Sequence, residues 1–239
     1  MMKSKKGKLI LIPCTLGETR LNKVLPQENT TYINTCSEFI VENIRSARRF
    51  LIKSNINTAI DDLNFHLLNK HTKKYELSFM LKSIYDGKNI GLLSEAGCPG
   101  IADPGAEIVK LAHKKNINII PLVGPSSILM GLMASGLNGQ NFAFNGYLPK
   151  DKKDRKKHIQ FLENLSFKNK QTQIFIETPF RNNHMLEDLC KYCQANTVLV
   201  VATNISTKSE NISRDSIENW RKKSVDLNKK PSVFLIHKY

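Results

Sequence analysis

The segment that decides the fold is NIGLLSEAGCPGIADPGAEIVKLAHKK, residues 89–115. Its first six residues form a short apolar run of the kind seen in buried strands. A loop rich in glycine and proline follows, and residues 105–115 then have the apolar spacing of an amphipathic helix. Residues 117–123 form the next apolar run. Strand, loop, helix and strand in this order predict a parallel α/β sheet.

The same alternation continues on both sides of this segment. We predict further strands at residues 8–13, 31–35, 63–68, 142–149, 172–177, 197–203 and 232–238. We predict further helices at residues 37–53, 73–86, 126–135, 151–165 and 180–194. Gly124-Pro125 marks a turn near the middle. We therefore expect two α/β domains, residues 1–122 and 123–239, that share a cleft.

The charge balance is the unusual feature of the composition. The 239 residues include 36 Lys+Arg and 21 Asp+Glu, a net charge of +15. Such an excess is typical of proteins that contact nucleic acid. An AT-rich genome is the alternative explanation, because 28 Lys and 23 Asn accompany only 8 Arg. The densest basic cluster lies within residues 150–157.

The apolar content and the cysteines favour a cytoplasmic protein without a membrane span. Hydrophobic residues make up 41% of the chain, and no apolar run approaches the roughly 20 residues of a membrane helix. The apolar stretch that begins at Lys8 is too short for a secretory signal. Five cysteines are an odd number, as expected in a reducing compartment. Cys190 and Cys193 have no second Cys/His pair at ligand spacing, so we expect structural cysteines and no metal.

Three loops that follow predicted strands carry the chemistry. They are residues 13–17, 94–105 and 123–127. In open α/β sheets, ligands bind beyond the carboxyl ends of the strands. Asp103 also precedes Pro104 and Gly105, which predicts that it caps the helix that follows. Neither G-x-x-x-x-G-K-[ST] nor G-x-G-x-x-G occurs, which disfavours nucleotide triphosphatases and NAD enzymes.

At these loops the sequence resembles a known family. The blocks are GLLSEAGCPGIADPGAEIV, IIPLVGPSSILMGLMASGL, FAFNGYLP, QIFIETPFRNNHMLEDL and VVATNISTKSE, in that order. They resemble the tetrapyrrole methylase superfamily of S-adenosylmethionine-dependent methyltransferases. Within it, they are most similar to the bacterial branch that 2′-O-methylates a cytidine of small-subunit ribosomal RNA. The family's E-D-T-R element corresponds to Glu42-Asn43-Ile44-Arg45, and its S-D-A-G-T-P loop to residues 94–99.

The resemblance implies a two-domain fold with S-adenosylmethionine in the cleft between the domains, and a homodimer. Carried over position by position, the cofactor contacts are Leu16, Glu95, Cys98, Ser126, Ser127, Ile176, Ala202 and Thr203. The likeness also implies ribosomal RNA or the small ribosomal subunit as a partner, and S-adenosylhomocysteine as a product.

The methyl acceptor and the catalytic base stay open at this point. A ribose hydroxyl has a high pKa, so a base or a cation beside its oxygen would assist transfer. Candidates are Glu42, Arg45, Arg48, Lys208 and Glu210. The helix with Arg45, Ser46, Arg48 and Arg49 either follows phosphates or is a solvated face. Besides an RNA methyltransferase, the alternatives are a small-molecule methyltransferase for a tetrapyrrole-like acceptor and a non-catalytic module that binds RNA or the cofactor.

Overall fold

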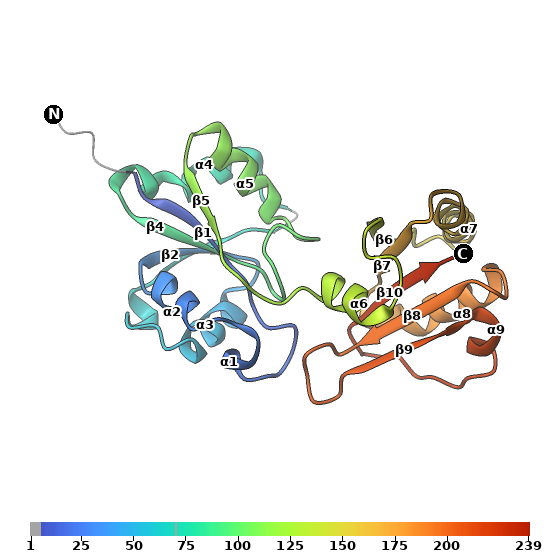
Figure 1. Ribbon diagram of the computed structural model, residues 1–239. Coiled ribbons are helices and arrows are strands. Elements are labelled where there is room, and N and C mark those ends of the chain that lie inside the picture. Colours follow the sequence, from blue (N-terminus) through green and yellow to red (C-terminus); the bar gives the residue numbers. More distant parts are fainter. Residues whose placement is uncertain (1–5, 70) are drawn as a thin grey trace. The chain divides into compact units, whose positions relative to one another are not determined.

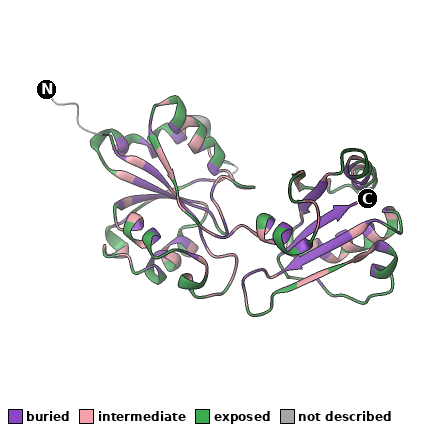
Figure 2. Ribbon diagram, in the orientation of Figure 1, coloured by how far each residue is buried: buried purple, intermediate pink, exposed green. Residues whose placement is uncertain are grey.

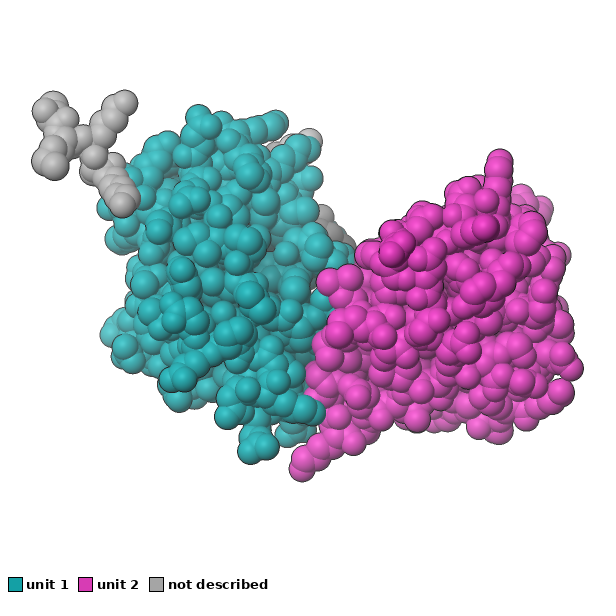
Figure 3. Space-filling view, in the orientation of Figure 1, with its two compact units in different colours: residues 1–126 teal, residues 127–239 magenta. Residues whose placement is uncertain are grey.

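The computed structural model describes residues 6–69 and 71–239. Its chain forms two compact units, residues 1–126 and 127–239, drawn in different colours in Figure 3. Each unit has its own sheet. That the two units fold as the independent domains 1–122 and 123–239 stays a prediction.

The first unit is built on a five-stranded parallel sheet with the order β3-β2-β4-β1-β5. The strands are β1 Lys8–Ile12, β2 Cys36–Val41, β3 Asn64–Leu67, β4 Asn89–Leu93 and β5 Asn118–Pro121. The helical segments are α1 Leu21–Val24, α2 Glu28–Ile33, α3 Ile44–Lys53, η1 Ile60–Asp62, α4 Lys74–Met80, η2 Lys82–Asp86 and α5 Gly105–Lys114. Figure 1 shows α4 and α5 on one face of the sheet and α1, α2 and α3 on the other.

Two cores cover the two faces of this sheet. Leu9 of β1 packs with Ala112 of α5 in one core. Ile10 and Ile12 point to the opposite face, where they join Leu51 of α3 in the other core. Because helices cover both faces, the central strands are mostly apolar and largely buried, as Figure 2 shows. This explains why short apolar runs identified most of these strands.

Two of the predicted elements in the first unit are wrong. Residues 31–35 were expected to form a strand, but α2 ends at Ile33, which packs into the core from that helix. Residues 37–53 were expected to form one helix, but they hold most of β2 and then α3. Phe39 and Ile40 are both fully buried, because β2 is an interior strand with covered faces. These two residues and the apolar residues of α3 happen to have the spacing of a single helix, and this caused the wrong prediction.

The second unit has a five-stranded mixed sheet with the order β6-β7-β10-β8-β9. The strands are β6 Phe142–Tyr147, β7 Thr172–Ile176, β8 Val198–Thr203, β9 Asn211–Ser216 and β10 Ser232–His237. β6 and β7 are parallel, and the other neighbours are antiparallel. β9 was not predicted, because NISRDS is a polar strand at the edge of the sheet with no buried residue.

Helices cover both faces of this second sheet as well. They are α6 Ser127–Ser135, α7 Lys152–Asn169, η3 Pro179–Arg181, α8 Asn182–Tyr192 and α9 Ile217–Trp220. Phe234 and Ile236 of β10 join the core beneath α7, α8 and α9. Leu235 points to the other face, where α6 crosses the sheet with Gly131 against it. Among the described residues, no helix is long and apolar enough to cross a membrane.

Candidate functional site

The three predicted loops of the first unit meet at the carboxyl ends of β1, β4 and β5. The backbone of Cys14 forms two hydrogen bonds with that of Gly97, over 2.9 and 3.1 Å. The thiol of Cys98 then donates to the carbonyl oxygen of Pro125 over 3.4 Å. We call the place where these loops touch the loop junction, defined by Cys14, Gly97, Cys98 and Pro125.

Gly97 is the residue that lets the loops of the junction approach one another. Its φ of +73° lies in the left-handed region, where a side chain is strained. A Cβ at this position would lie 3.2 Å from Cδ2 of Leu16 and 3.4 Å from the oxygen of Pro125. The junction therefore needs a glycine for its backbone conformation and for close packing.

Asp103 holds the second half of the loop that follows β4. Its Oδ1 accepts hydrogen bonds from the backbone N–H groups of Gly100, over 2.8 Å, and Gly105, over 2.7 Å. Gly105 is the first residue of α5 and Pro104 occupies the N-cap position, so the prediction of Asp103 at the N-cap is wrong by one residue, although its carboxylate accepts the first N–H of the helix. Burial raises the pKa of this carboxyl group, and the two hydrogen bonds oppose that effect.

Two more carboxylates lie beside the junction. Oε1 of Glu42, just after β2, accepts a hydrogen bond from the backbone N–H of Glu95 over 3.2 Å. Burial raises the pKa of Glu42; the hydrogen bond lowers it, and the nearby charges of Asp103 and Glu95 raise it further. The hydroxyl group of Ser46 in α3 donates to Oε1 of Glu95 over 2.5 Å. Three carboxylates, from the segment after β2 and the loop after β4, are thus gathered at one edge of the sheet.

Asn43 caps a helix in this chain. The family that the sequence resembles has an aspartate at this position. The side chain of Asn43 accepts hydrogen bonds from the backbone N–H groups of Arg45 and Ser46, over 2.9 and 3.2 Å. An Asn and an Asp cap a helix about equally well. The departure from the family pattern therefore leaves the start of α3 intact.

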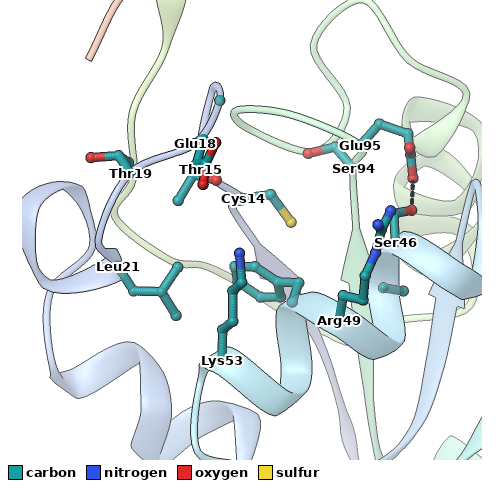
Figure 4. Close-up of a pocket in the computed structure, with 13 residues that line it drawn as sticks. Cys14, Thr15, Glu18, Thr19, Leu21, Ser46, Arg49, Lys53, Ser94 and Glu95 are labelled. Carbon is teal, nitrogen blue, oxygen red and sulfur yellow. Dashed lines mark hydrogen bonds between the residues drawn. The ribbon is translucent and has the colours of Figure 1, made fainter. Parts of the chain in front are cut away.

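A pocket of about 330 Å³ opens beside the loop junction (Figure 4). One wall is the segment that follows β1, and the other is a single face of α3. Ser94 and Glu95 close it at the end of β4. The residues that line it are Cys14, Thr15, Gly17, Glu18, Thr19, Leu21, Ser46, Ala47, Arg49, Phe50, Lys53, Ser94 and Glu95.

Of the predicted cofactor contacts and catalytic candidates, only Glu95 lines this pocket, but Ser46 and Arg49 of the helix that was considered for phosphate contact line it as well. Sequence reasoning missed Thr19 and Lys53 as site residues. Lys53 lies one turn beyond Arg49 in the helix predicted at residues 37–53, so its spacing to Ser46 and Arg49 was a usable signal. Burial raises the pKa of the Cys14 thiol, so that thiol stays protonated in the pocket wall.

The other predicted contacts fall at loop and strand ends. Leu16 lies in the loop after β1 and Ser126 ends the first unit, whereas Ser127 is the first residue of α6 in the second unit. Ile176 and Ala202 both pair with Val233 of β10, from opposite sides. Directly opposed residues point to the same sheet face, so these two side chains share a face.

Ala202 and the next residue, Thr203, are both buried, and Ala202 lies beneath Gly131 of α6. Whether any predicted contact touches the cofactor stays a prediction, as does a cofactor position between the domains.

The remaining catalytic candidates have different surroundings. Oε2 of Glu210 accepts a hydrogen bond from the backbone N–H of Ser206 over 2.6 Å, so it shapes the loop after β8. Lys208 is exposed in that same loop. Arg45 is exposed at the start of α3, and Arg48 forms an ion pair with Asp61.

The cysteines of the C-x-x-C pair belong to the packing of the second unit. Cys193 is buried in the core, and Cys190 packs against it. All five cysteines are free thiols. Within residues 6–69 and 71–239, no group of His, Cys, Asp and Glu side chains is arranged to hold a metal ion.

Comparisons with known proteins define the class to which this fold and junction belong. The family model of the tetrapyrrole (corrin/porphyrin) methylases matches residues 37–220. The chain belongs to this family and is an S-adenosylmethionine-dependent methyltransferase. The resemblance read from the loops is therefore confirmed.

Two curated relatives of this chain carry the same protein name. The chain is 30% identical over 236 residues to ribosomal RNA small subunit methyltransferase I of Buchnera aphidicola, covering 98% of this chain and 79% of that protein. It is 31% identical over 220 residues to the Bacillus subtilis protein of the same name, covering 90% of this chain and 69% of that one.

Solved structures share the fold. The methyltransferase CobJ has a TM-score of 0.66 at 15% identity, covering 97% of this chain and 94% of that one. Uroporphyrin-III C-methyltransferase of Thermus thermophilus, complexed with S-adenosylhomocysteine, has a TM-score of 0.60 at 12% identity, covering 97% and 98%. The predicted α/β class and the two-unit architecture are thereby confirmed.

The residues at the loop junction fit a cationic cofactor. S-adenosylmethionine carries a sulfonium and an ammonium group, and the junction gathers the carboxylates of Glu42, Glu95 and Asp103. Gly97 and Gly100, both with positive φ, leave the backbone of the loop without side chains there. A cation would also offset the repulsion that raises the pKa of Glu42.

Proposed function

We propose that this chain methylates a ribose 2′-hydroxyl group in small-subunit ribosomal RNA. The observation that carries the proposal is the 30% identity, over 98% of the chain, to a protein named for methylating that RNA. The net charge of +15 supports a polyanionic acceptor. The exposed lysines of α7 and the cations of the pocket provide places for phosphates.

The chain's own residues would bind and orient the reactants. When bound, S-adenosylmethionine supplies a methyl group activated on sulfur. We place its contacts at Leu16, Glu95, Cys98, Ser126, Ser127, Ile176, Ala202 and Thr203. Holding donor and acceptor in line accounts for much of the rate enhancement of such a displacement.

We propose Glu42 as the group that takes the proton from the acceptor hydroxyl. The proton must leave as the oxygen forms its bond to carbon, and a carboxylate with a raised pKa is a stronger base than an ordinary one. Glu42 has such a raised pKa and lies beside the junction. We propose that Arg45 and Lys208 contact the RNA, whereas Glu210 shapes the loop after β8 through its hydrogen bond from Ser206.

The test is transfer of a radiolabelled methyl group to purified small ribosomal subunits, followed by mapping of the modified nucleotide. We expect one labelled nucleotide, resistant to alkaline cleavage on its 3′ side because its 2′-hydroxyl is blocked. Label on a base, or label only on a tetrapyrrole such as uroporphyrinogen, would overturn the proposal. Cofactor binding without any transfer would favour a binding module.

We further propose a homodimer located in the cytoplasm. The homodimer is supported by the family resemblance, and the cytoplasm by five free thiols and a ribosomal acceptor. Light scattering should give about twice the chain mass of 27.1 kDa. A monomer at micromolar concentration would contradict the homodimer, and recovery in a membrane or secreted fraction would contradict the location.

A further inference from the structure

The pocket of the first unit carries two cations on one face of α3. Ser46, Arg49 and Lys53 are separated by three and four residues, so they lie above one another along the helix. Phe50 lies on the same side and also lines the pocket. Figure 4 shows the side chain of Lys53 extending from α3 toward the loop that holds Thr15 and Glu18, and that of Arg49 extending toward Ser46.

These two cations differ from their neighbour on the helix. Arg48 is neutralised by Asp61 outside the pocket. Among the described residues, neither Arg49 nor Lys53 has a carboxylate within ion-pair distance, although Glu18 and Glu95 line the same pocket. Both are exposed. The pocket therefore presents two positive charges that are available to an anion.

The remaining lining suits a nucleotide. Thr15, Thr19 and Ser46 offer hydroxyl groups that donate to or accept from a sugar, and the ring of Phe50 offers a flat apolar surface for a base. A volume of about 330 Å³ is at the lower end of ligand pockets and suits one nucleotide unit.

The pocket also has the right neighbours for an acceptor. It shares Cys14, Ser94 and Glu95 with the loops of the junction, where we place the cofactor. It includes no residue from 97–105 or 123–127, so the glycine loops lie outside it. An occupant of the pocket would thus be beside the methyl donor without displacing it.

We propose that this pocket holds one nucleotide of the acceptor RNA, with a phosphate between Arg49 and Lys53. The proposal rests on the proposed function and adds the place where the RNA enters the first unit. Arg49 and Lys53 are then positioning residues for the substrate, and the phosphate contact sets the register of the strand.

The test compares two double variants of the whole protein. Arg49→Ala with Lys53→Ala removes the two pocket cations. Lys110→Ala with Lys114→Ala removes two cations with the same spacing from α5, on the opposite face of the sheet. Each variant is assayed for S-adenosylhomocysteine binding by calorimetry and for binding to small ribosomal subunits between 50 and about 300 mM salt.

The pocket variant should lose affinity for the subunits and have a shallower salt dependence. One phosphate lies between the two cations, so losing this contact should lower the log–log slope by roughly 0.7–0.9. The α5 variant should keep the wild-type slope, and both should bind S-adenosylhomocysteine normally. Arg49→Gln with Lys53→Gln retains most of the side-chain length and repeats the test should the alanine variant fold poorly.

Two results would overturn the proposal. One is an unchanged slope in the pocket variant while the wild type methylates the subunits, which leaves the proposed function standing. The other is a loss of S-adenosylhomocysteine affinity in the pocket variant, which assigns the pocket to the cofactor. A wild-type protein that transfers no methyl group to the subunits contradicts the proposed function itself, and is recognised without any variant.

Discussion

The hydroxyl group of Ser46 lies 2.5 Å from Oε1 of Glu95, and this hydrogen bond joins α3 to the loop after β4. The two residues are 49 positions apart in the chain. The bond links the wall of the pocket to the loop that forms the junction with Cys14. A ligand that moves Glu95 would therefore alter a contact of α3. An RNA that moves α3 would alter a contact of the loop after β4.

Replacing Ser46 with alanine should slow methyl transfer more than it weakens cofactor binding. The variant releases the Glu95 carboxylate at the entrance of the pocket. A hydrogen bond to a charged group contributes roughly 1.5–3 kcal/mol, so we expect at least about a tenfold loss in kcat/KM. Ser46→Thr keeps the hydroxyl group and should retain most activity. Equal activity of Ser46→Ala and wild type on small ribosomal subunits would show that the contact has no role in transfer.

Gly97→Ala should weaken the binding of S-adenosylhomocysteine. The substitution forces a side chain into a left-handed backbone, which costs about 1–2 kcal/mol, and presses its Cβ against Leu16 and Pro125. Gly136→Ala is the matched control, because Gly136 has a φ of +64° with nothing within 4 Å of the added Cβ. Both variants should lose similar stability in urea, and only Gly97→Ala should lose cofactor affinity in calorimetry. Matching affinities for the two variants would contradict a cofactor site at the junction.

Glu42 should make the protein's stability depend on pH. Burial raises the pKa of this carboxyl group in the folded state above its ordinary value of 4.5. The folded protein then binds more protons than the unfolded chain between the two pKa values, so this group's contribution to the free energy of unfolding falls as the pH rises through that window. Glu42→Gln removes the titration and keeps an oxygen to accept the N–H of Glu95. The variant should therefore gain stability relative to wild type between pH 4.5 and 7, measured by urea unfolding. A constant difference across that range would contradict the prediction.

The fold could largely be predicted because most strands have a clear local sequence signal. Residues 89–93 and 232–237 are apolar on both faces, and turn residues bound them. The failures came where a local signal was ambiguous. Cys36–Val41 was merged with the helix that follows because both of its faces are apolar, and Asn211–Ser216 was missed because its edge position leaves it polar.

The site could be predicted only as far as chain order allows. Loops after parallel strands share one edge of a sheet, so the junction of the loops at Cys14, Gly97 and Pro125 was foreseeable. The hydrogen bond between Ser46 and Glu95 was not, because it depends on how α3 packs against the sheet. Nor could the sequence show that Arg48 pairs with Asp61 whereas its neighbour Arg49 lines the pocket.

The basic cluster at residues 150–157 shows the same limit. The side chain of Arg155 is 11% exposed, and its guanidinium group pairs with the buried Asp188 over 2.6 Å. It also donates to the carbonyl oxygens of Pro149 and Lys150. Arg155 therefore anchors the start of α7 to α8, and only the lysines around it are exposed to a partner.

Four of the exposed lysines of this cluster, all within α7, give the last prediction. Replacing Lys152, Lys153, Lys156 and Lys157 with alanine should weaken binding to small ribosomal subunits and flatten its salt dependence. Each lysine that neutralises a phosphate adds roughly 0.7–0.9 to the log–log slope, because the phosphate releases its counterions. Cofactor affinity should stay unchanged, since none of the four belongs to the proposed cofactor contacts. The variant should also fold normally, as its Arg155–Asp188 pair is intact.

The matched control lies on the same helix. Lys168→Ala with Lys170→Ala removes exposed lysines at the C-terminal end of α7 and its C-cap, and Lys168 lies about 16–24 Å from the four lysines at a rise of 1.5 Å per residue. If the lysines at the start of α7 contact RNA phosphates, the change in slope per lysine will be large for the quadruple variant and near zero for the control. If the charge reflects genome composition alone, both variants will keep the wild-type slope, and a small-molecule acceptor becomes the better explanation. Equal changes per lysine in both variants would indicate a diffuse electrostatic attraction and contradict a contact at residues 152–157.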